Sequence, residues 1–188
     1  MKKLIIPTLL IALGITCRFI PHIPNFAPIG AIAIFGALYL PKRWVLILPI
    51  SAMFISDIFI GFYSWQIMVS VYVGFILMGV IGLWIRKNKK FSTLVGGTLL
   101  GSVLFFFITN FSVWAFGTMY IHSFAGLIQS YYMALPFFRN SLAGDLFYVG
   151  VLVGSFETIK YYLKNRFKID TQIERLPVGR QGRQMAGK

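Results

Sequence analysis

The lysines and arginines of this chain divide it into apolar runs, and this pattern limits how the chain can fold. Basic clusters stand at residues 2–3, 42–43, 86–90 and 160–168. Loops on the cytoplasmic side of a membrane carry an excess of Lys and Arg, so the runs between these clusters have to cross the bilayer in pairs. The pattern therefore predicts an all-α integral membrane protein, a six-transmembrane-helix bundle with both termini in the cytoplasm.

The composition agrees with a membrane protein. The chain is 57% hydrophobic and 12% charged, with a mean hydropathy of +0.76, whereas a soluble domain is about 45–50% apolar and about 25% charged. The formal charge of +13 raises nucleic acid as a partner. Apart from Arg18 and Arg139, however, every Lys and Arg lies in a basic cluster or from Lys160 onward, where topology and anionic lipid explain it. No nucleic-acid-binding motif accompanies the charge, so nucleic acid is not an expected partner.

Six apolar runs approach the length of about 20 helical residues that a bilayer core demands. The expected spans are residues 4–20, 28–40, 44–62, 67–85, 92–116 and 141–163. The second is short and follows Pro21, Pro24 and Pro28, which prevent a regular helix because proline lacks an amide donor. Irregular backbone at membrane depth is tolerated only where protein or water covers it, so this segment is expected to line or cap a cavity. The first run resembles a secretory signal but is expected to remain as a span.

The stretch from Gly117 to Asn140 is too polar to span a membrane cleanly. It is expected to form an additional outer amphipathic or re-entrant helix that Pro136 ends. A seventh span here would put the last basic stretch outside, against the charge rule. Residues 1–168 are thus predicted to be a single transmembrane helical domain, and residues 169–188, which have few apolar side chains, a disordered basic cytoplasmic tail.

Most of the remaining polar side chains fall on the outer side in this topology. Asp57 lies about two turns before the outer end of its span, where a carboxylate costs a few kcal/mol unless it is paired or hydrated. Asp57 is either half of a structural ion pair, with Arg18 as its partner, or a ligand or proton site. Arg139 and Asp145, six residues apart at the start of the last span, can pair with each other or with other spans.

Asn110 and Trp114 are four residues apart, on one face of the outer half of the fifth span. An amide one turn from an aromatic surface suits a flat heterocyclic ligand. Alternatively, Asn110 bonds a neighbouring helix and Trp114 belongs to the interfacial aromatic belt. His22 and His122 stand in separate loops without a spaced motif, so no metal site is expected.

Gly30, Ala33 and Ala37 give the second span small residues at helical spacing. Such a face allows close helix packing, either inside the bundle or against a partner membrane protein.

No enzyme motif is present: the chain lacks a Gly-x-Ser-x-Gly elbow, a His-Glu-x-x-His motif and a phosphate loop. The single cysteine, Cys17, excludes an intrachain disulfide. We therefore expect neither catalytic residues nor a cofactor.

Several strings between Arg18 and Glu157 look like those of a widespread bacterial family of uncharacterised membrane proteins, a domain of unknown function. They are RFIPHIPNFAP from Arg18, Ser56-Asp57, TNFSVW from Thr109, AGL from Ala125, PFFRN from Pro136 and Gly144-Asp145. The architecture is also similar to the S components of energy-coupling factor transporters. Those six-helix proteins bind vitamins or their precursors on the outer side and rely on partner subunits for energy. One departure is that their Ala-x-x-x-Ala coupling pattern lies in the first helix, whereas Ala33 and Ala37 lie in the second span here.

These observations lead to the hypothesis of a membrane substrate-capture protein in the bacterial inner membrane. It would take a small vitamin- or cofactor-like molecule from outside, with membrane and ATPase subunits of the energy-coupling factor type as implied partners. One alternative is a proton- or ion-coupled small carrier or channel that uses Asp57 and Asp145. Another is a non-transporting assembly or scaffold protein whose outer polar residues pair off. The expected substrate-binding residues are Arg18, His22, Asn25, Asp57, Asn110, Trp114, Tyr131, Arg139, Asn140 and Asp145.

Overall fold

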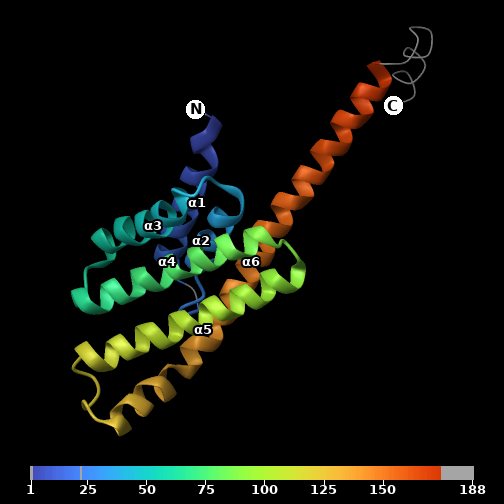
Figure 1. The fold of residues 1–188 in the computed structure, drawn as a ribbon. Helices are drawn as coiled ribbons and strands as arrows, with labels where there is room; N and C mark the ends of the chain where they lie inside the picture. The colour runs from blue at the N-terminus through green and yellow to red at the C-terminus, as the bar shows by residue number, and fades with distance from the viewer. Residues whose placement is uncertain (1, 22, 175–188) are drawn as a thin grey trace. The chain divides into compact units, whose positions relative to one another are not determined.

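The computed structural model describes residues 2–21 and 23–174, and within them the chain is all-helical. Figure 1 shows the helices in chain order. They are α1 (Lys2–Phe19), α2 (Ile29–Tyr39), α3 (Trp44–Ile60), α4 (Trp65–Lys87), α5 (Phe91–Phe116) and α6 (Phe124–Glu174). The first five begin and end within about two residues of the predicted spans, because prolines or basic clusters flank most of their ends and Gly61 and Gly117 follow α3 and α5.

The last helix corrects the prediction of a separate outer helix ended by Pro136. Helix α6 continues through Pro136 without a break and is 51 residues long. Proline removes a single backbone donor, and an apolar helix tolerates this loss where its surroundings satisfy the freed carbonyl. In Figure 1 the gold first part of α6 turns relative to the orange part that follows, as expected of a helix that contains a proline.

Contacts divide the chain into two compact units, Met1–Leu152 and Val153–Lys188. The first unit holds α1 to α5 and the start of α6, and the cavities of the candidate site are lined by residues of this unit alone. The second unit holds the rest of α6, which continues six residues past the predicted start of the tail. Residues 175–188 of the predicted disordered tail lie outside the described residues.

Helix α2 is the centre of the first unit. Every residue from Ile29 to Leu38 is buried, and α2 packs against α1, α3, α4 and α5. Gly82 of α4 allows the closest approach, since a Cβ atom there would meet Cβ of Ala37 and the backbone of Ile34. The small residues predicted to pack helices, Gly30, Ala33 and Ala37, are thus buried inside this chain.

The outward faces of the other helices are apolar. Phe59 is 72% exposed and Phe91 is 82% exposed, and many further Leu, Ile and Val side chains lie on the surface. Soluble monomers rarely expose so large an apolar surface to water. Among the described residues, three helices combine the length and apolar character needed to cross a bilayer: α4, α5 and α6 as far as Arg166; α1, α2 and α3 are apolar but shorter. Together these features indicate a multi-pass membrane protein.

Candidate functional site

A cavity of about 320 Å³ lies among the helices of the first unit. Its polar lining comes from five different segments and consists of Arg18, Asn25, Tyr63, Thr109, Ser141 and Asp145. Its apolar lining consists of Ala27, Ile29, Met53, Val71, Phe75 and Phe105. A few polar groups that converge from separate elements on an apolar chamber are typical of a small-molecule site.

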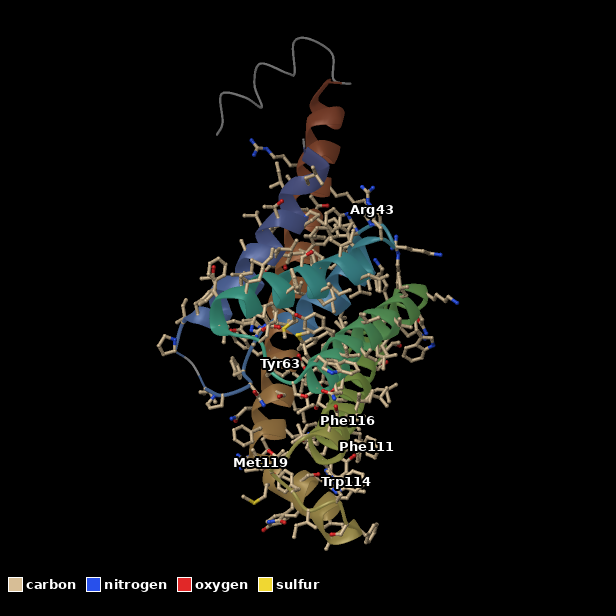
Figure 2. All side chains as sticks on the ribbon, turned by 90° about the vertical axis from the view of Figure 1, so that its left-hand side faces the viewer. Arg43, Tyr63, Phe111, Trp114, Phe116 and Met119 are labelled. Carbon is tan, nitrogen blue, oxygen red and sulfur yellow. The ribbon has the colours of Figure 1, made fainter. Side chains whose placement is uncertain are left out.

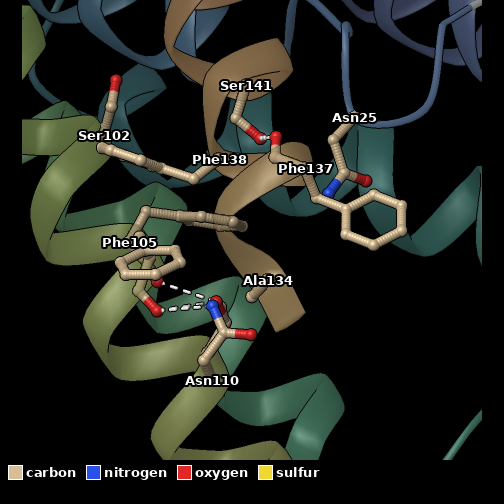
Figure 3. A pocket seen from close by; sticks show the side chains of 10 residues that line it. Asn25, Ser102, Phe105, Asn110, Ala134, Phe137, Phe138 and Ser141 are labelled. Carbon is tan, nitrogen blue, oxygen red and sulfur yellow. Dashed lines mark hydrogen bonds between the residues drawn. The ribbon is translucent and has the colours of Figure 1, made fainter. Parts of the chain in front are cut away.

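A second cavity of about 130 Å³ adjoins the first and shares Asn25, Phe105, Thr109 and Ser141 with it. Figure 3 shows this smaller cavity, with Ser102 and Asn110 on α5 opposite Ala134 and Phe138 on α6. The two volumes therefore form one chamber with a larger and a smaller lobe.

The chamber lies towards the end of the bundle where the α1–α2 and α3–α4 loops contribute Asn25 and Tyr63. Two basic clusters, residues 42–43 and 86–90, lie at the other end of this unit, where Arg86 donates to the carbonyl of Leu40 at 2.9 Å and Lys89 lies 4.5 Å from the ring centroid of Tyr39. Figure 2 shows the same separation, with Arg43 near the upper end and Tyr63 well below it. The two ends of the first unit therefore differ: one holds the chamber and the other holds the basic side chains.

One wall of the chamber contains an ion pair. Nη2 of Arg18 lies 2.7 Å from Oδ1 of Asp57, whose side chain is 1% exposed. The other guanidinium nitrogen, Nη1, donates to Oγ of Ser56 at 2.8 Å, and Ser56 in turn donates to the carbonyl of Ala52. The structure confirms the ion pair with Arg18 that the sequence predicted as one of two interpretations of Asp57.

The second carboxylate oxygen of Asp57 is also satisfied. Tyr72 donates its hydroxyl to Oδ2 at 2.8 Å. Oδ1 has no hydrogen bond of good geometry, so the charge of Arg18 rather than a directed hydrogen bond holds it. Asp57 is therefore neutralised before any ligand arrives.

The Arg18–Asp57 ion pair influences the pKa of Tyr63, which lies in the loop between α3 and α4. Partial burial and, second, the negative charge of Asp57 raise the pKa of Tyr63 to about 12, while the charge of Arg18 acts in the opposite direction. The phenol thus stays protonated at neutral pH and can donate a hydrogen bond into the chamber.

Asp145 of α6 has very different surroundings. It is 7% exposed and lines the chamber, and its Oδ2 lies 2.7 Å from Oγ of Ser102. That hydroxyl has one proton and also lies 3.0 Å from the carbonyl of Thr98. Among the described residues no Lys, Arg or His pairs with Asp145, and Arg139, which the sequence offered as a partner, is exposed. Of the two possibilities that the sequence left open, Arg139 and Asp145 do not pair with each other, and Asp145 contacts another span through Ser102.

Two predicted amides line the smaller lobe. Asn25 has a positive φ of 64°, a left-handed conformation that Asn adopts more readily than most residues, in the proline-rich loop after α1. Asn110 donates from Nδ2 to the carbonyl of Phe106 in its own helix at 2.8 Å. The loop therefore lines the chamber as its prolines predicted, and the two amides lie on opposite sides of one lobe.

The remaining predicted site residues lie elsewhere. Trp114 donates to the carbonyl of Ile121 and packs edge-on against His122, while Tyr131 donates to the carbonyl of Phe107. Neither they nor Arg139 and Asn140 line either lobe, and His22 lies outside the described residues. No group of three His, Cys, Asp or Glu side chains suited to a metal ion occurs in the described part of the chain.

Asn110 of α5 was predicted from the sequence, but three further residues of α5 at the chamber were not. Ser102, Phe105 and Thr109 line the chamber, and the buried polar residues Thr98 and Ser112 continue the same helical face. Their spacing of three and four residues was a detectable signal, because a hydroxyl-bearing stripe on an apolar helix faces protein or water rather than lipid.

Comparison with known proteins shows the family of the chain. A family of unknown function, DUF6580, matches residues 1–168, and the chain belongs to this family. No curated protein and no solved structure matches the chain significantly.

Proposed function

We propose that this DUF6580 protein is a six-span capture protein of the bacterial inner membrane, which binds a small cofactor-like molecule from the outer side. The observation that carries the proposal is the two-lobed chamber. Its larger lobe, about 320 Å³, has the size of sites for small organic molecules, which measure about 300–1,000 Å³.

The polarity of the first unit supports the orientation. Basic clusters favour the cytoplasmic side of a membrane, and the clusters at residues 42–43 and 86–90 lie at the end of the first unit opposite the loops of Asn25 and Tyr63. In this orientation the chamber faces the outside and both termini lie in the cytoplasm. A ligand would enter beside the proline-rich loop.

Release inward would need a partner module of the energy-coupling factor type or a slow toppling of the whole protein. The small-residue face of α2 is buried within the chain, so it is not a surface for such a partner. A coupling partner would have to bind the exposed apolar faces of other helices.

The test is to identify a molecule that is retained during purification. Protein extracted in mild detergent is denatured, and the released small molecules are compared by mass spectrometry among the wild type, Ser141→Phe and Val151→Phe. Ser141 lines both lobes, whereas Val151 is exposed on the same helix. The wild type and Val151→Phe should both carry the molecule, and a folded Ser141→Phe should not. An identical set of molecules in all three proteins would refute capture in this chamber.

The alternative of an ion-coupled carrier is supported by one observation, the absence of a cationic partner for Asp145 among the described residues. A carrier that moves a charge through the membrane gains or loses about 2.3 kcal/mol per 100 mV. Uptake into proteoliposomes driven by a potassium-diffusion potential, and lost in Asp145→Asn, would favour the carrier. Binding that does not respond to the potential would favour capture.

A further inference from the structure

The ionisable groups around the chamber include two carboxylates, Asp57 and Asp145, and one described cation, Arg18. Arg18 lines the chamber, but the guanidinium of Arg18 is already neutralised by Asp57. Asp145 lines it as well, and no described cation balances it. If both carboxylates are ionised, the groups around the chamber sum to one negative charge.

We infer that Asp145 binds a positively charged group of the ligand, and that the ligand class is a small organic cation with a protonated amine or amidine on an aromatic or apolar body. The inference rests on the proposed capture function and narrows its substrate. It gives the buried carboxylate the partner that a charge at this depth requires.

The geometry leaves one oxygen of Asp145 for this purpose. Oδ2 is within hydrogen-bond distance of Ser102, and that contact is the one hydrogen bond to the Asp145 carboxylate among the described residues. Gly30 of α2 lies against Oδ1, and a Cβ atom there would collide with it. The missing side chain at Gly30 therefore provides the room that Asp145 occupies beside the chamber.

The walls of the chamber suit the body of such a cation. The rings of Phe75 and Phe105 lie 4.6 Å apart at 36° and both line the larger lobe, as does Tyr63. Aromatic faces attract cations and stack on flat rings, an attraction of about 0.5–2 kcal/mol that grows as water is excluded. An anionic ligand would instead meet Asp145, and no described cation at the chamber is free to receive it.

Three probes of similar shape test the inference: benzylamine, which is cationic at neutral pH, benzyl alcohol, which is neutral, and benzoate, which is anionic. Binding to the purified full-length protein is measured by saturation-transfer NMR at constant ionic strength, in wild type, Asp145→Asn and Glu157→Gln. Glu157→Gln removes a carboxylate outside the chamber and serves as the matched control.

The wild type and Glu157→Gln should bind benzylamine roughly tenfold or more tightly than benzyl alcohol, as expected for one charge-assisted hydrogen bond. Asp145→Asn should lose this preference while it binds benzyl alcohol as the wild type does. If Asp145→Asn fails to fold, the relative affinities of the wild type for the three probes still test whether the chamber prefers a cation.

Three results would overturn the inference. They are no detectable binding of benzylamine, binding of benzyl alcohol or benzoate at least as tight, and a cation preference that persists in Asp145→Asn. Displacement of benzylamine by sodium at the same ionic strength would also overturn it in favour of an inorganic ion. Each of these leaves the capture proposal standing if the purified protein still carries a molecule that Ser141→Phe loses.

Discussion

Two aspartates are buried in the same unit, and their surroundings are opposites. Asp57 has an arginine on one oxygen and a tyrosine hydroxyl on the other. Asp145 has a single serine, which it shares with a backbone carbonyl, and an oxygen without a described donor. Both lie in helices of an apolar protein, where a carboxylate is expensive unless it is paired. The contrast indicates that Asp57 stabilises the fold, whereas Asp145 is available to bind a ligand.

The difference also shows why burial alone does not identify a binding residue. Asp57 is the more deeply buried of the two, yet its charge is balanced within the protein. What distinguishes Asp145 is the missing partner together with its position on the chamber. If the two aspartates differ in this way, substitutions around them should change stability most at Arg18 and least at Tyr63.

Replacement of Arg18 by Gln should have the largest effect. It leaves Asp57 buried without its cation, a loss of about 3–5 kcal/mol in the free energy of unfolding. Chemical or thermal unfolding in detergent measures the effect. Arg139→Gln, which removes an exposed arginine, should change stability by less than about 0.5 kcal/mol. If both variants unfold alike, Arg18 is not the partner that holds Asp57.

Replacement of Gly30 by Ala tests the space beside Asp145. The added methyl group would meet Oδ1 of Asp145 and the side chain of Met78, and overpacking of this kind costs about 1–3 kcal/mol. Gly96→Ala is the control, because a Cβ atom there meets nothing within 4 Å and alanine favours a helix by up to about 1 kcal/mol. Equal stability of the two variants would mean that Asp145 and Met78 move aside to accommodate the methyl group at no measurable cost.

Replacement of Asp145 by Asn should leave stability within about 1 kcal/mol of the wild type or raise it, because the change removes a buried charge that no described cation balances. Asp57→Asn should destabilise the protein, because Arg18 then loses its counter-charge. Unfolding of the two variants side by side gives the sign of each effect. A large loss in Asp145→Asn alone would reverse the roles assigned to the two aspartates.

The smallest effect concerns Tyr63 at alkaline pH. Its pKa in the folded protein is about 12, above the ordinary value of 10.0, so the unfolded chain loses its proton first as the pH rises. The contribution of Tyr63 to stability should therefore be constant below about pH 10 and be lost between about pH 10 and pH 12. Tyr63→Phe should show a shallower fall in this range. Because Tyr63 is 39% exposed, the difference is expected to be modest.

The sequence predicted most of the helices but not the continuity of the last one. Apolar runs interrupted by basic clusters and prolines define α1 to α5, because charged side chains are expensive inside a bilayer and proline interrupts a helix. In α6, Pro136, Arg139 and Asn140 looked like a boundary, yet a proline inside a helix removes only one donor. The polar residues near Pro136 therefore suggested a helix end that does not exist, because the backbone hydrogen bonds of α6 continue on both sides of the proline.

The site was predictable only in part for a related reason. The cost of a buried charge identified Arg18 and Asp57 as a pair and marked Asp145 as unusual. The partner of Asp145 on α5 could not be found from charge, since Ser102 carries none. Which of Asn110 and Trp114 reaches the chamber depends on the rotation of α5 against α6, and this rotation is set by side-chain packing that no single helix reveals.

The enclosure of α2 also sets an order of events while the chain is being made. Three of the helices that surround it, α3, α4 and α5, are synthesised later, so α2 leaves the ribosome before most of its packing partners exist. Its 11 residues rise about 16 Å, roughly half of the hydrocarbon thickness, and such a segment cannot cross unaided. Helix α2 must therefore enter the bilayer in the company of α1 and α3. The arrival of Gly79 and Gly82 on α4 then seals it from lipid.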